Sequence, residues 1–125
     1  MSLSRLAAVA ALSILASPAA AQPARPTVTI GVYSFGFSPK PIRLRAGQPV
    51  TLTFVNQSSH GHDFTAKEFF AASAIGAGSA PDGRIALAGG QTVSVTLTPR
   101  AGTYPAHCSH FLHSSMGMTD QIIVG

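Results

Sequence analysis

Residues 104–118 read Tyr-Pro-Ala-His-Cys-Ser-His-Phe-Leu-His-Ser-Ser-Met-Gly-Met. Within this stretch Cys108, His113 and Met118 are evenly spaced, with four residues between each and the next. A strand-forming run precedes Cys108 and another follows Met118, so the segment between them is expected to be a connecting loop. This loop would hold a thiol, an imidazole and a thioether at one end of the fold.

The segments around this loop alternate between apolar and polar residues, which is typical of strands. Residues 91–98 alternate most strictly, with Val93, Val95 and Leu97 on one face. About seven short strands with turn signals between them predict an all-β fold, a Greek-key antiparallel β-sandwich. Residues 65–77 break the alternation and predict a short helical insert. The other expected strands cover residues 28–32, 42–45, 49–56, 83–87, 102–108 and 121–124.

The first 21 residues have the pattern of an export signal. Arg5 supplies a positive charge, residues 6–15 are apolar, and residues 19–21 offer small side chains for cleavage. The apolar run is too short to span a bilayer as a stable helix, and retention as an anchor is the alternative. We expect residues 1–21 to be a signal peptide, and residues 22–125 to form one domain in the periplasm with no membrane span.

The charges of the exported part exclude one class of partner. Without Arg5 the chain has seven Lys and Arg residues against four Asp and Glu residues, a net charge of +3. The positive residues are scattered singly, so they form no stripe for nucleic acid. We therefore expect no nucleic-acid partner, although the mild positive excess would favour an acidic protein partner.

Cys108 is the only cysteine of the chain, so it cannot form an intramolecular disulfide. It is expected to be either a buried, inert thiol or a metal ligand. His113 and Met118 follow it in the loop, and His62 upstream can supply a second imidazole. Two imidazoles, a thiolate and a weak axial thioether are the donor set of a type 1 copper site. These residues therefore predict one mononuclear copper site.

Three segments together carry a resemblance to a known family. They are residues 35–56, the run Asn56-x5-His62-Asp-Phe64, and Gly102-Thr-Tyr104-x3-Cys108-x4-His113-x4-Met118. In these segments the chain resembles the cupredoxins, the type 1 (blue) copper proteins, and among them the small bacterial plastocyanin- and auracyanin-like periplasmic domains. The resemblance implies a cupredoxin-like copper-binding domain over residues 22–125. It also implies His62, Cys108 and His113 as the strong copper ligands, with Met118 as the axial ligand.

The sequence departs from this family at three positions. Four residues separate Cys108 from His113, where plastocyanin-type loops have two. Asp63 follows the first histidine where Asn is common, and Leu112 precedes the second where Pro is common. An anion near the site should favour Cu(II) and lower the reduction potential, an effect that hydrogen bonds to Asp63 would offset.

The residues themselves leave alternatives open for the ligands and for the metal. Met116 competes with Met118 as the thioether ligand, and His110 competes with His113. A second, labile copper site formed by His60, His110 and Met116 is the alternative to these side chains being solvated loop residues. A structural zinc site with His62, Cys108 and His113 would leave the thioether unused.

Two functions from different classes are compatible with such a site. The first is a one-electron carrier that cycles between Cu(I) and Cu(II) and meets its protein redox partners transiently. The second is copper handling, in which the protein buffers copper or exchanges it with copper-donor or copper-acceptor proteins. We do not expect an enzyme, because oxidase and reductase chemistry in copper proteins needs further copper centres on further domains. We also expect a monomer.

Overall fold

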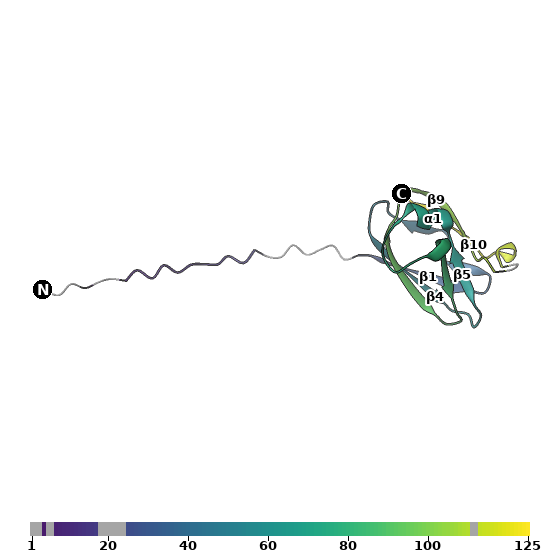
Figure 1. Ribbon diagram of the computed structural model, residues 1–125, viewed down its shortest axis with the longest axis horizontal. Coiled ribbons are helices and arrows are strands. Elements are labelled where there is room, and N and C mark those ends of the chain that lie inside the picture. The colour runs from purple at the N-terminus through teal and green to yellow at the C-terminus, as the bar shows by residue number, and fades with distance from the viewer. Residues whose placement is uncertain (1–3, 5–6, 18–24, 111–112) are drawn as a thin grey trace.

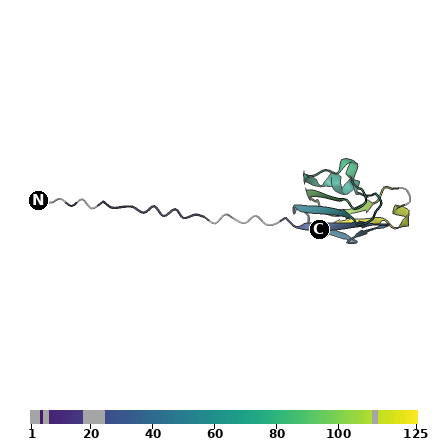
Figure 2. The same ribbon diagram turned by 90° about the horizontal axis from the view of Figure 1, so that it is seen from below.

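The computed structural model describes residue 4 and residues 7–17, 25–110 and 113–125. From residue 25 onward the chain forms two stacked β-sheets (Figures 1 and 2). The first sheet has the strand order β2-β1-β4-β8-β6. Its strands are β1 (Thr27–Tyr33), β2 (Gly36–Ser38), β4 (Val50–Asn56), β6 (Ala74–Ala77) and β8 (Thr92–Thr98).

The second sheet has the strand order β3-β10-β9-β5-β7. Its strands are β3 (Ile42–Leu44), β5 (His62–Thr65), β7 (Arg84–Leu87), β9 (Gly102–His107) and β10 (Thr119–Val124). One short helix, α1 (Lys67–Ala72), and two 3-10 turns, η1 (Pro81–Gly83) and η2 (Ser114–Met116), lie in the connections. The predicted β-sandwich with a short helical insert is confirmed.

Aromatic side chains hold the two sheets together. Phe37 and Phe54 come from the first sheet and Phe64 from the second, and all three are at most 1% exposed. The ring centroid of Phe64 lies 5.2 Å from that of Phe37 and 4.9 Å from that of Phe54. Full burial of a phenylalanine side chain stabilises a fold by roughly 1.5–3 kcal/mol. The core therefore joins both sheets next to His62, which lies two residues before Phe64.

Two strand pairs run parallel. The alternation of side chains could not distinguish parallel pairs from antiparallel ones. β1 pairs with β4 in parallel, and β3 pairs with β10 in parallel. The other pairs are antiparallel, including β4 with β8 and β9 with β10. A parallel pair needs a long connection, so β1 reaches β4 only after the chain has crossed to the second sheet and formed β3.

The helical insert is shorter than predicted. Residues 67–72 are helical, but residues 74–77 form β6, which pairs with the edge of β8. Gly76 weakens a helix, and the free edge of β8 offers backbone hydrogen bonds to this segment. The prediction of helix over residues 74–77 is therefore wrong, because the sheet edge outweighs the local preference.

β5 was not expected as a strand, because its sequence does not alternate. All four of its residues, from His62 to Thr65, are buried. β5 pairs with β7 over its whole length, and Thr65 also pairs with His107 of β9. A strand covered on both faces shows no period of two, so its pattern gave no signal.

The loop of residues 108–118 lies at one end of the sandwich, whereas the start of β1 and the C-terminus lie at the other (Figure 1). β1 runs from Thr27 toward the turn with Phe35, whose ring contacts His113. β10 runs away from the loop, and the amide of Gly125 donates a hydrogen bond to the carbonyl of Leu44 at 3.1 Å.

Residues 7–17 form no helix or strand. The predicted cleavage site at residues 19–21, Arg5 and Leu112 lie outside the described residues. No helix in the described part of the chain has the length and apolar character needed to cross a membrane.

Candidate metal centre

Three of the four predicted ligands point their donor atoms at one another. His62 begins β5, Cys108 directly follows β9, and His113 lies in the loop between β9 and β10. The two Nδ1 atoms of His62 and His113 are 3.3 Å apart, and Sγ of Cys108 lies 3.4 Å from Nδ1 of His113. All three donor atoms lie within 4.8 Å of one another. We call these residues the inner cluster.

The separations in the inner cluster fit a shared ion. Bonds of about 2.0 Å to nitrogen and about 2.3 Å to sulfur, at trigonal or tetrahedral angles, place neighbouring donors roughly 3.3–3.8 Å apart. The observed 3.3 Å and 3.4 Å are close to this range. Nε2 of His62 is buried without a hydrogen-bond partner in the described part of the chain, so the polar contact of this ring is made by Nδ1.

Asn56 fixes the segment that leads to His62. This side chain is 1% exposed and lies at the end of β4. Its amide nitrogen donates to the carbonyls of His60 at 2.7 Å, Ala88 at 3.0 Å and Leu87 at 3.3 Å. Its carbonyl oxygen accepts hydrogen bonds from the amide and the hydroxyl of Ser58. This one buried side chain therefore ties the first sheet to the segment before β5 and to the end of β7. We call these hydrogen bonds the Asn56 clamp.

Asp63 links β5 to the loop beside Cys108. The Ser109 amide donates to Oδ1 of Asp63 at 2.8 Å, and the Ser109 hydroxyl donates to Oδ2 at 2.5 Å. The hydroxyl of Thr65 donates to Oδ1 at 2.7 Å. Burial would raise the pKa of Asp63, but these hydrogen bonds outweigh it and hold the pKa below 3.8, so the carboxylate is ionised at neutral pH.

Burial changes the protonation of two inner-cluster residues. Burial, together with the neighbouring His113, lowers the pKa of His62 below 6.5, so its imidazole is neutral and can offer a lone pair. Burial raises the pKa of the Cys108 thiol above 9.0, while the backbone N–H groups of Asp63 and His110 donate to the sulfur and oppose this. A metal must therefore displace the thiol proton when it binds.

The two loop methionines differ in exposure. Met118 is fully buried and packs in the core with Cys108, whereas Met116 is 59% exposed. The carbonyl of Met118 accepts a hydrogen bond from the Cys108 amide at 3.1 Å. Gly117 has a φ of +96°, which residues with a side chain rarely adopt, and this turn returns the chain to the core at Met118.

Comparison with known proteins identifies the family. A family model described as a cupredoxin-like domain matches residues 5–124. The chain belongs to the cupredoxin-like domain family. In this cupredoxin-like chain, the inner cluster of one cysteine and two histidines fits a type 1 copper site.

Solved structures of auracyanins share the fold of this cupredoxin. Reduced auracyanin from the photosynthetic bacterium Roseiflexus castenholzii has a TM-score of 0.61 and 20% identity over 79% of this chain and 96% of its own. Auracyanin B has a TM-score of 0.57 and 23% identity, with coverage of 80% and 88%.

Auracyanin A, a "blue" copper protein from the green thermophilic photosynthetic bacterium Chloroflexus aurantiacus, has a TM-score of 0.58 and 23% identity, with coverage of 80% and 99%. At these identities the likeness establishes the fold alone. No curated protein sequence matches the chain.

The remaining histidines of this cupredoxin occupy different positions. His110 is 44% exposed at its side chain, and its Nε2 lies 3.5 Å from Oδ2 of Asp63. His60 is exposed and belongs to no described group of metal-ligating side chains. His107 is exposed while the next residue, Cys108, is buried, as expected for neighbours on opposite faces of a strand.

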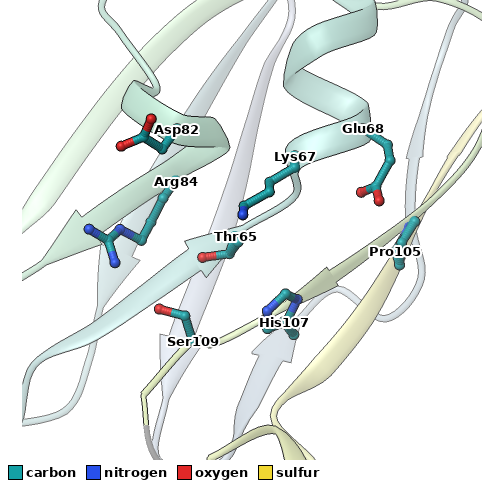
Figure 3. Close-up of a pocket in the computed structure, with 8 residues that line it drawn as sticks. All are labelled: Thr65, Lys67, Glu68, Asp82, Arg84, Pro105, His107 and Ser109. Carbon is teal, nitrogen blue, oxygen red and sulfur yellow. The ribbon is translucent and has the colours of Figure 1, made fainter.

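A surface pocket lies beside the link between Asp63 and Ser109 (Figure 3). Lysine and arginine line it together with two carboxylates, so its charges are balanced. Two of its wall residues, Thr65 and Ser109, hydrogen-bond Asp63. The lining residues are Thr65, Lys67, Glu68, Asp82, Arg84, Pro105, His107 and Ser109. None of the four predicted ligands is among them.

Two features near the metal centre were not found from the sequence. The clamp made by Asn56 joins residues 31 and 32 positions apart, which no local pattern reveals. The grouping of Asp63, Cys108 and His110, whose donor atoms also lie within 4.8 Å of one another, was missed as well. The order His-Asp in β5 and Cys-Ser-His after β9 could have suggested it, had β5 been recognised as a strand.

Proposed function

We propose that this cupredoxin is a periplasmic type 1 copper protein that carries single electrons between protein partners. The supporting observation is the inner cluster itself. A thiol sulfur and two Nδ1 atoms from distant segments meet at donor separations of 3.3 Å and 3.4 Å in a buried place. Type 1 copper is the centre that this donor set suits best.

In this proposal His62, Cys108 and His113 are the strong ligands and Met118 is the weak axial ligand. Copper, when bound, supplies the one-electron change between Cu(I) and Cu(II). The protein keeps the donors in nearly one arrangement in both states, because Asn56 fixes the approach to His62 and the Ser109–Asp63 hydrogen bonds fix the residue after Cys108. Such support by surrounding hydrogen bonds limits rearrangement during electron transfer.

His113 is the proposed route for the electron. It is the least buried member of the inner cluster. The ring of Phe35 packs edge-on against it with a centroid separation of 5.7 Å, and Phe35 has an unusual φ of +65°. Phe35 is 43% exposed and Met116 is 59% exposed. A protein partner would dock on this apolar surface, in a small and transient contact.

Export to the periplasm follows from the predicted signal peptide, with the domain of residues 22–125 as the mature monomer. Mass spectrometry of the protein recovered from the periplasm tests this. A chain beginning at Gln22 is expected. A chain that keeps residues 1–21 and stays with the membrane would contradict cleavage.

The decisive experiment is visible and EPR spectroscopy of the copper-loaded mature protein. Wild type is expected to show strong thiolate-to-copper charge transfer, and Cys108→Ser is expected to lose it completely. Met118→Leu should shift the spectrum while Met116→Leu should leave it unchanged. A colourless wild-type protein would refute the proposal and favour a zinc site.

A second candidate function is copper handling. The exposed imidazole of His110 beside Cys108 favours it, because an accessible donor helps a metal to exchange. A carrier should keep its copper through many redox cycles, whereas a handling protein should release it. Transfer of all the copper to an apo-acceptor protein within minutes would favour handling over electron transfer.

A further inference from the structure

His110 is held over the metal centre in a way that a simple ion pair does not explain. Its side chain is 44% exposed, and its Nε2 is 3.5 Å from the Asp63 carboxylate. That carboxylate already accepts three hydrogen bonds from Ser109 and Thr65. A half-exposed ion pair of this length contributes little to stability, so it gives little reason for this arrangement.

The same imidazole belongs to a second group of metal donors. Donor atoms of Asp63, Cys108 and His110 lie within 4.8 Å of one another. We call these three residues the outer cluster. It shares Cys108 with the inner cluster, and it differs by having an exposed member and a carboxylate in place of two histidines. Carboxylate, imidazole and thiolate together can ligate Cu(II) or Zn(II).

The two clusters lie side by side. The ring of His110 is 5.3 Å from that of His113 and 6.3 Å from that of His62, measured between centroids, and it lies within 29° of parallel to each. An ion bound to the Cys108 sulfur could therefore exchange its other ligands without leaving the sulfur. His110 is also more exposed than the buried His62 and the half-buried His113.

We propose that the outer cluster is the entry position through which copper reaches the inner cluster. This inference rests on the proposed function, because it assumes that the inner cluster is the final copper site. His110, Asp63 and Cys108 would hold the entering copper first, and the Cys108 thiol would lose its proton to solvent. His62 and His113 would then replace His110 and Asp63 as ligands, while Cys108 would stay bound. The oxidation state of the metal would not change.

The electrostatics of the outer cluster favour this first step. The Asp63 side chain is 1% exposed, and His110 is the only group with which it pairs within salt-bridge distance in the described residues. A cation arriving at the exposed imidazole therefore finds a carboxylate oxygen 3.5 Å from Nε2 of His110. A buried carboxylate with a cation near it is stabilised by their attraction, which is strong away from bulk water.

Copper uptake by the apo-protein tests the proposal. Stopped-flow absorption of the thiolate-to-copper band is followed after mixing with Cu(II) in wild type, His110→Ala and His60→Ala. His110→Ala should slow uptake at least about tenfold and reach the wild-type spectrum. His60→Ala is the matched control, an exposed histidine outside both clusters, and it should load at the wild-type rate.

Two results of this experiment would overturn the proposal. Uptake by His110→Ala at the wild-type rate would show that the outer cluster is not on the entry route. A changed final spectrum would make His110 a ligand of the final site instead. If circular dichroism shows that His110→Ala does not fold, His110→Gln takes its place with the same expected results.

A cadmium titration tests the outer cluster without relying on type 1 copper. In the His113→Ala background, the thiolate-to-cadmium absorption band reports binding to Cys108. Adding His110→Ala should weaken Cd(II) binding at least about tenfold, and adding His60→Ala should not. Equal affinities in all three variants would refute the outer cluster. Because this readout needs no type 1 spectrum, it separates failure of the entry position from failure of the proposed function.

Discussion

The two sheets of the sandwich differ in what they bury. Among the described residues, the first sheet buries one polar side chain, Asn56, which lies at the end of β4 nearest the metal centre. The second sheet buries four polar side chains: His62, Asp63, Thr65 and Asp120. Burying polar groups costs free energy unless they are paired. The first sheet therefore supplies apolar stability, while the second sheet and its loop hold the chemical groups.

The largest expected effect comes from a cavity in the first sheet. Leu97 in β8 is 1% exposed, and Leu97→Ala should lower the free energy of unfolding by about 2–5 kcal/mol. Urea unfolding of the apo-protein measures this, and Leu97→Met, which conserves volume, should cost less than about 1.5 kcal/mol. The copper spectrum of folded Leu97→Ala should match wild type. A changed spectrum would mean that the two sheets do not have separate roles.

The second largest expected effect concerns Asp63, a buried carboxylate of the second sheet that accepts three hydrogen bonds. Asp63→Asn removes a charged acceptor facing the Ser109 hydroxyl, and it should lower the free energy of unfolding of the apo-protein by about 1.5–3 kcal/mol at pH 7. Asp82→Asn is the control, since Asp82 is exposed and asparagine tolerates its φ of +55°. An equal loss in both variants would contradict a special role for Asp63.

The pH dependence of the free energy of unfolding in wild type and Asp63→Asn tests the direction of this contribution. Hydrogen bonds hold the folded-state pKa of Asp63 below its ordinary value of 3.8, so the unfolded state binds the proton more readily. The stabilisation is fully present above the unfolded pKa and is lost as the pH falls through the folded pKa. Wild type should therefore lose more stability on acidification than Asp63→Asn. If the free energy of unfolding depended on pH equally in wild type and Asp63→Asn, this explanation would be wrong.

The third effect tests Asn56, the one buried polar side chain of the first sheet among the described residues. Asn56→Ala leaves the carbonyls of His60, Leu87 and Ala88 without their buried donor and should cost about 1–3 kcal/mol. Copper affinity should also fall about tenfold, because His62 loses its support. Competition with a copper chelator measures this, with the exposed neighbour change Gln57→Ala as control. Unchanged affinity would limit Asn56 to a structural role.

The smallest effect has the opposite sign. Asp120 is 4% exposed, its Oδ1 accepts the Gln121 amide, and its Oδ2 has no partner in the described residues. Burial raises its pKa above 3.8, so ionisation opposes folding, and this penalty disappears as the pH falls through the raised pKa. Asp120→Asn should therefore slightly stabilise the apo-protein at pH 7, as measured by thermal unfolding. Destabilisation would show that Oδ2 of Asp120 has a partner when the chain is folded.

The same contrast between sheets explains what the sequence could reveal. β4 and β8 face the core with alternate residues, so their periodicity predicted them. β5 is buried on both faces and contains His62, Asp63 and Thr65, so it looked like a polar loop. The inner-cluster residues were predicted because their side-chain chemistry is unusual and can be recognised from the sequence. The Asn56 clamp and the outer cluster depend on contacts between distant segments, which only the folded chain brings together.

The start of β1 and the C-terminus lie at the end of the sandwich opposite the loop of residues 108–118 (Figure 1). β1 alone spans seven residues, or about 20 Å at roughly 3.3 Å per residue. An affinity tag, a linker to another protein or a covalent bond to an electrode could be attached at the C-terminus and still leave Phe35 and His113 facing outward. The protein could thus be immobilised in a defined orientation, and voltammetry on such a surface would read the metal directly.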